Sequence, residues 1–192
     1  ILYFVNAMKN IIMLISSILF GVVLSFLFFI FIIFLISRFS KKEHKKFEPR
    51  VSIVVPAYNE EQNIEDCLAS IFSANYPKNK IEVLIVDDGS TDNTIKILKK
   101  YKKVKILRQN HLGKVEALNF GVLNSSNDFI ITLDADTTMD KNCISELVKP
   151  FSDKKVGATT GNNKVKNKKS ILSAFQNIEY HFSNLIRNSF ST

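Results

Sequence analysis

Residues 51–60 read VSIVVPAYNE, a short apolar run followed at once by proline and then by tyrosine, asparagine and glutamate. A brief run rich in β-branched side chains is typical of a strand that is buried on both faces of a sheet. In open α/β sheets, ligands bind in the crevice beyond the carboxyl ends of the strands. The stretch therefore predicts a buried strand with a functional loop at its end.

Three further short apolar runs follow, at residues 81–86, 104–107 and 129–133. Between the runs, apolar residues recur at helical spacing, which predicts intervening helices. These residues are Ile64, Leu68 and Ile71, then Ile95 and Leu98, and then Val115, Leu118 and Val122. Alternating strands and helices favour right-handed crossovers, and so predict an α/β fold with a mostly parallel, Rossmann-like sheet and helices on both faces.

The chain begins differently, because residues 10–37 contain no charged side chain. A short segment, 1–10, is thus followed by one predicted transmembrane helix, 11–37, long enough to cross a bilayer. Basic residues crowd the linker 38–50, whereas only Lys9 precedes the helix, and the positive-inside rule then places the following domain, 51–192, in the cytoplasm. A cleaved signal peptide is the alternative, but its apolar region should be shorter and end in small residues. We expect a single-pass protein of the cell membrane.

The net charge of +8 also bears on partners. The lysines lack the interleaved aromatic residues of a single-strand binder, so we expect no nucleic acid, and a lipid bilayer is the better partner. The two cysteines fit a reducing compartment and are interpreted as small core residues. The three histidines lack ligand spacing, and none is assigned to a metal.

Acidic residues follow two of the predicted strands. Asp87 and Asp88 come after the second run, and Asp134 and Asp136 come after the fourth. Carboxylates at this edge would repel a phosphate unless a divalent cation lay between them, so Asp134 and Asp136 predict a site for Mg²⁺ or Mn²⁺ that also binds a diphosphate. Lys114, at the start of a predicted helix, adds a positive charge near the same phosphates.

Four segments in order resemble family 2 glycosyltransferases of the GT-A fold: SIVVPAYNEE at 52–61, VDDGSTD at 86–92, GKVEALN at 113–119 and LDAD at 133–136. The resemblance covers about residues 51–190. A membrane helix directly before the domain is similar to the processive synthases of cellulose, chitin, hyaluronan and poly-N-acetylglucosamine. Polyprenyl-phosphate sugar transferases are the alternative, although their membrane helices usually follow the catalytic domain.

The resemblance implies an inverting transfer of a sugar from a nucleotide-sugar donor, most simply a UDP-sugar, to a growing glycan or a lipid-linked acceptor. Carried over by position, it implies that Pro56, Tyr58 and Glu60 line the nucleoside pocket. It further implies that Asp88, together with Asp87, hydrogen-bonds the base.

At the other end of the donor, the resemblance implies that Lys114 and Asn119 lie beside the diphosphate and the floor of the site. Asp134 would contact the ribose or the metal, and Asp136 would be the principal metal ligand. For Tyr58 and Asn119, packing or capping is the structural alternative.

The acceptor half is expected to lie outside this sequence. Synthases of this kind continue into a segment with the general base, a Gln-x-x-Arg-Trp motif and further membrane helices, whereas this chain has no tryptophan. An inverting transfer needs a carboxylate to take the acceptor's proton, and we expect that base beyond Thr192. Residues 176–180, QNIEY, resemble the helix that follows the metal motif in the synthases. An inactive module that binds nucleotide sugar is a further alternative.

Overall fold

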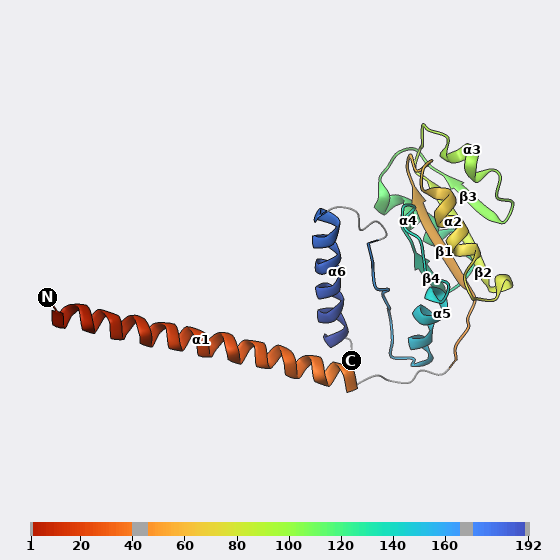
Figure 1. The fold of residues 1–192 in the computed structure, drawn as a ribbon. Coiled ribbons are helices and arrows are strands. Elements are labelled where there is room, and N and C mark those ends of the chain that lie inside the picture. The colour runs from red at the N-terminus through yellow and green to blue at the C-terminus, as the bar shows by residue number, and fades with distance from the viewer. Residues whose placement is uncertain (1, 40–45, 166–170, 191–192) are drawn as a thin grey trace. The chain divides into compact units, whose positions relative to one another are not determined.

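A computed structural model of the chain describes residues 2–39, 46–165 and 171–190. Its contacts divide the chain into two units. One unit is His44–Gly161, and the other joins Ile1–Glu43 with Asn162–Thr192. Figure 1 shows the sheet and its helices in the first unit and two long helices in the second.

The first unit is built on a sheet of four parallel strands in the order β3-β2-β1-β4 (Figure 1). The strands are β1 (Val51–Ala57), β2 (Ile81–Asp87), β3 (Val104–Arg108) and β4 (Phe129–Thr132). They coincide with the predicted apolar runs, so the predicted parallel α/β fold is confirmed. Because the strands are parallel, the loops that follow them all leave from one edge of the sheet.

Strand β1 lies in the middle of the sheet, and all of its residues are buried. Ile53 and Val55 pack into the larger core cluster with α2 (Ile64–Phe72), α3 (Thr94–Leu98) and α5 (Cys143–Val148). Val54 points to the opposite face, where the smaller cluster contains Ala117 of α4 (Lys114–Leu123). Helices thus cover both faces, which is why the run is apolar throughout instead of alternating.

Helix α4 forms where it is predicted, but of the three apolar residues that marked it only Leu118 packs against the smaller core cluster. Val115 and Val122 are 68% and 41% exposed, while Ala117 and Gly121 are buried. A Cβ atom on Gly121 would lie 2.3 Å from Val54 Cγ1. The helix therefore approaches the sheet through its smallest residues, because a larger side chain there would collide with the strand.

Two short 3₁₀ helices, η1 (Lys78–Lys80) and η2 (Lys149–Ser152), complete the first unit. Cys67 is fully buried, as expected of a small core residue, and Cys143 is half-buried.

The second unit contains α1 (Leu2–Phe39) and α6 (Ile171–Phe190). Within α1, the segment Met8–Leu35 contains an 18-residue window with a mean hydropathy of 3.2 and is, by length and composition, able to cross a bilayer. The predicted span, 11–37, lies inside α1. Helix α6 includes residues 176–180 and exposes Leu172, Phe175, Ile178 and Phe182.

Replacing Gly121 with alanine should destabilise the first unit. The added methyl group would overlap Val54 and Val86, and overpacking of this kind typically costs about 1–3 kcal/mol. Thermal unfolding of the full chain in detergent, followed by circular dichroism, should show a lower midpoint. Gly157→Ala is the matched control, since nothing lies within 4 Å of its added Cβ. Equal midpoints for the two variants would show that α4 can shift away from the sheet.

Candidate functional site

The loops after β1, β2 and β4, together with the start of α4, surround a cleft of about 290 Å³ at the carboxyl edge of the sheet. Most of the residues proposed from the sequence line it together, although they are far apart in the chain. They are Pro56, Tyr58, Glu60, Asp88, Lys114, Asp134 and Asp136. The parallel sheet is the cause, because it brings these strand ends to one edge.

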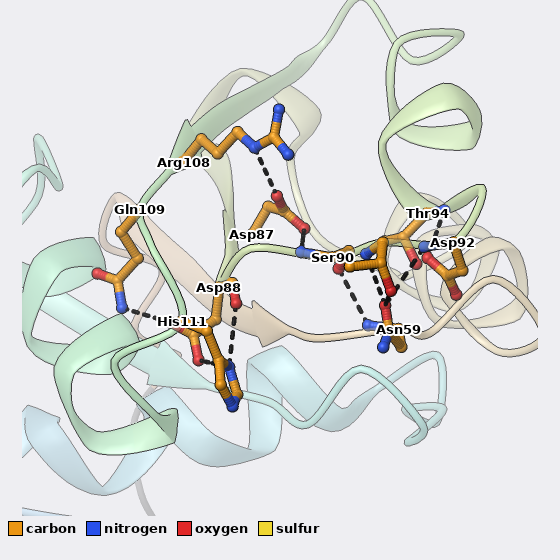
Figure 2. A network of polar contacts seen from close by, with 10 residues as sticks. Asn59, Asp87, Asp88, Ser90, Asp92, Thr94, Arg108, Gln109 and His111 are labelled. Carbon is orange, nitrogen blue, oxygen red and sulfur yellow. Dashed lines mark hydrogen bonds and ion pairs between the residues drawn. The ribbon is translucent and has the colours of Figure 1, made fainter.

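Asp87 and Asn119 do not line this cleft. Asp87 is fully buried, where its Oδ1 accepts a hydrogen bond from Ser90 N at 3.2 Å and its Oδ2 lies 3.1 Å from Arg108 Nε (Figure 2). Asn119 lies on an exposed part of α4. Asp87 thus braces the turn after β2, and the contacts of both residues with a donor stay predictions.

The loop after β1 is fastened to the loop after β2 through Asn59 (Figure 2). Asn59 has a φ of 55°, a left-handed conformation that asparagine tolerates better than most residues. Its Oδ1 accepts a hydrogen bond from Thr91 N at 2.8 Å, and its own N–H donates to Ser90 Oγ at 3.0 Å. Glu60 N donates to Thr94 Oγ1 at 2.8 Å. These bonds fix the backbone on which Tyr58 and Glu60 face the cleft.

The Asp88 carboxylate is almost fully buried and organises the segment 109–113. Its Oδ1 accepts hydrogen bonds from Gln109 Nε2 at 2.7 Å and Leu112 N at 2.9 Å, and its Oδ2 accepts one from Gly113 N at 2.9 Å. Burial alone would raise the pKa of Asp88, but these hydrogen bonds and the nearby His111 outweigh it and lower that pKa. The ionised carboxylate therefore holds the loop that leads into α4.

His111 belongs to the site, although the sequence analysis gave it no role. Its ring stacks on that of Tyr58, with centroids 4.0 Å apart and planes 23° from parallel. Its Nδ1 lies 2.9 Å from Asp88 Oδ2, as Figure 2 shows. In the sequence, its position in the segment between the third strand and Gly113 was the signal that could have indicated a role. No residue spacing identifies a histidine in such a loop as part of a site.

Lys114 and Asp134 form an ion pair at the mouth of the cleft, with Nζ and Oδ1 2.7 Å apart. Their side chains are 60% and 54% exposed, so the pair contributes at most about 1 kcal/mol and can exchange partners. Asp136 is exposed, and Thr137 Oγ1 lies 3.3 Å from its Oδ1. Both carboxylates are therefore accessible to another cation.

Negative charge accumulates on this side of the cleft. The thiol pKa of Cys67 is raised to about 12, first by burial and then by Asp136, Glu60 and Asp134. Within the described ranges, no group of three or more His, Cys, Asp or Glu side chains forms a ready-made metal cluster. One or two carboxylates suffice for Mg²⁺ when substrate phosphates supply further oxygens, and Asp134 and Asp136 fit that chemistry.

The strand order and the acidic cleft at the carboxyl edge define a glycosyltransferase domain of the GT-A type. Residues 52–189 match the model of glycosyl transferase family 2, and the chain belongs to that family. The mannosyltransferase PcManGT from Pyrobaculum calidifontis, solved with GDP-Man and Mn²⁺, is similar with a TM-score of 0.63 and 26% identity. That similarity covers 82% of this chain and 46% of the other. The family and the fold expected from the motifs are confirmed.

Curated relatives are polysaccharide synthases. The poly-beta-1,6-N-acetyl-D-glucosamine synthase of Staphylococcus epidermidis is 37% identical over 145 residues, which is 73% of this chain and 34% of the relative. The synthase of the same name from Staphylococcus aureus (strain COL) is 38% identical over 135 residues, 68% of this chain and 32% of the relative. The chain thus spans about a third of the length of these relatives.

Replacing Asp88 with asparagine should destabilise the domain in a pH-dependent way. The folded-state pKa of Asp88 lies below its ordinary value of 3.8, so its contribution is present above that pH and is lost as the pH falls through the lowered pKa. Weakening charge-assisted hydrogen bonds should cost about 2 kcal/mol at neutral pH. Melting temperatures of both proteins across acidic pH should converge.

Asp128→Asn is the matched control for that comparison, since the exposed Asp128 carboxylate forms no hydrogen bond or ion pair with another described side chain. Its melting temperature should follow the parent's at every pH. If Asp88→Asn had the same melting temperature as the parent at neutral pH, the loop would not depend on the carboxylate.

Proposed function

We propose that this chain is the donor-binding part of a membrane-anchored glycosyltransferase that transfers a sugar, with inversion, from a nucleotide sugar to a growing glycan. The observation that carries the proposal is the single cleft in which the loops after β1, β2 and β4 meet the start of α4. The relatives named as poly-beta-1,6-N-acetyl-D-glucosamine synthases support N-acetylglucosamine as the sugar, and UDP-N-acetylglucosamine as the donor to test first.

Tyr58 and Asp88 are the proposed base-binding residues. Tyr58 is 42% exposed and presents an aromatic ring on which a base can stack. Asp88 can accept an N–H from a base only in exchange for one of the donors that it now holds. Two of those donors are backbone N–H groups of the segment 109–113, so Asp88 shapes the pocket in addition to any direct contact.

Asp134 and Asp136 are the proposed ligands of Mg²⁺ or Mn²⁺. When bound, such a cation stabilises the negative charge of a departing nucleoside diphosphate. A cation on Asp134 would release the Lys114 ammonium, which lies 2.7 Å from that carboxylate and can then turn to a phosphate oxygen. The structure of PcManGT is a complex with GDP-Man and Mn²⁺, which supports a divalent metal in this fold.

Nucleotide binding by this chain should depend on the metal. Calorimetry of the full chain in detergent should show UDP binding with Mn²⁺ and much weaker binding with a chelator. Asp136→Asn should remove most of the effect of Mn²⁺. Losing a group that only orients a metal ligand commonly costs about 10- to 100-fold in affinity, and losing a ligand should cost at least as much.

Asp128→Asn again serves as the control, because it removes an equal charge outside the cleft. Equal UDP affinity with metal and with chelator would contradict the proposed roles of Asp134 and Asp136. Tighter binding of GDP than of UDP would contradict a UDP-sugar as the donor.

The proposed anchor is α1, whose segment Met8–Leu35 is apolar and has no buried residue in its most apolar 18-residue window. An apolar helix that is not buried against protein is unfavourable in water but favourable in the hydrocarbon core of a bilayer. The basic residues after it support a cytoplasmic domain, where nucleotide sugars are available to the cleft.

A test of this topology can use single cysteines. In a Cys143→Ser background, with Cys67 fully buried, Lys155→Cys should react with a membrane-impermeant maleimide only after the cells are lysed. Asn6→Cys, on the other side of the proposed span, should react in intact cells. The opposite pattern of labelling would reverse the proposed orientation.

A further inference from the structure

The imidazole of His111 makes the two contacts that are proposed above for the nucleobase. It stacks on Tyr58, and its Nδ1 lies 2.9 Å from Asp88 Oδ2. Imidazole resembles a base in these two respects, since both are flat nitrogen heterocycles that stack and hydrogen-bond at the ring edge.

There is no room for a base between the two rings. Their centroids are 4.0 Å apart, which is already the separation of two rings in contact. A base can therefore stack on the covered face of Tyr58 only after the imidazole has left it. At Asp88 the carboxylate already accepts hydrogen bonds from Gln109 and two backbone N–H groups and lies 2.9 Å from His111 Nδ1, so a base must replace one of these partners.

The His111 ring is held by its stack on Tyr58 and by its Nδ1, which lies 2.9 Å from Asp88 Oδ2 and 3.2 Å from Asp88 O. The His111 side chain is 58% exposed, so no layer of packed residues holds it against Tyr58 from outside. The two backbone donors of Asp88 lie at Leu112 N and Gly113 N, so the loop keeps those bonds when the imidazole turns away. Gly113 has a φ of 99°, and this left-handed hinge separates the loop from α4.

We propose that His111 is an affinity-determining residue that occupies the base position of the free cleft and that the nucleobase must displace. The inference rests on the proposed function, because it takes Tyr58 and Asp88 as the base-binding residues. Its consequence is that part of the base's binding free energy is spent on removing the imidazole, which lowers the apparent affinity for the nucleotide.

Calorimetry of the full chain with UDP and Mn²⁺ tests this competition. His111→Ala should bind UDP about two- to tenfold more tightly than the parent, the range expected for releasing one aromatic contact. Pyrophosphate with Mn²⁺ has no base, so its affinity should be the same in both proteins. Val115→Ala is the matched control, because that side chain is 68% exposed, follows the same loop and does not line the cleft.

A double-mutant comparison and a spectrum make the outcome decisive. In a Tyr58→Ala background, His111→Ala should gain less affinity, because the stack is already lost. Since the chain has three histidines, the His111 ring protons can be assigned by NMR. They should lie upfield while stacked on Tyr58 and move downfield when UDP binds with the diamagnetic Mg²⁺, a readout that needs no variant to fold.

The possible failures are distinct. Absence of UDP and pyrophosphate binding in the parent would contradict the proposed function itself. A different result would overturn the displacement of His111. The parent would bind UDP, His111→Ala would bind it equally well or more weakly, and the His111 resonances of the parent would stay upfield in the complex. His111 would then contact the bound base and would not be displaced by it.

Discussion

Strand β1 is paired with β2 on one side and with β4 on the other, and both of its faces are covered by helices. All other features of the first unit depend on this position. A strand enclosed on four sides can carry almost only apolar or small side chains, and Val51, Ile53, Val54 and Val55 are fully buried. The pairing of β1 with β2 and β4 consequently fixes the position of the loop after β1, which lies between the loops that follow those two strands.

The parallel direction of the strands then decides what those loops can do. Tyr58 follows β1, Asp88 follows β2 and Asp134 follows β4, so three side chains meet at one edge: an aromatic ring, a buried hydrogen-bonded carboxylate and an exposed carboxylate that is proposed to bind a metal. The close approach of α4, made possible by Gly121, brings Lys114 to the same edge.

Polar contacts within the cleft show why its residues are interdependent. Asn59 ties the first loop to the second, and Asp88 ties the second to the segment before α4. The Asp88 carboxylate is stabilised as a buried ion by the donors that it organises, so shape and charge at the proposed base end depend on one group. At the proposed phosphate end the exposed pair of Lys114 and Asp134 is weak by comparison and suited to exchange.

The sequence by itself determined the four strands, their α/β order and the family, because buried strands in a parallel sheet need short apolar runs and the loops after them carry fixed motifs. It also identified most residues of the cleft, since topology alone brings strand ends together. Only the tertiary structure decided that Ala117 and Gly121, not Val115 and Val122, face the sheet, because the distance between helix and strand fixes which side chains fit. Three further features are seen only in the tertiary structure. His111 stacks on Tyr58, Asp87 does not line the cleft, and Asp88 accepts a hydrogen bond from the loop before α4. Those contacts join residues up to about fifty positions apart through loops without periodicity, and no local pattern in the chain encodes which of their side chains meet.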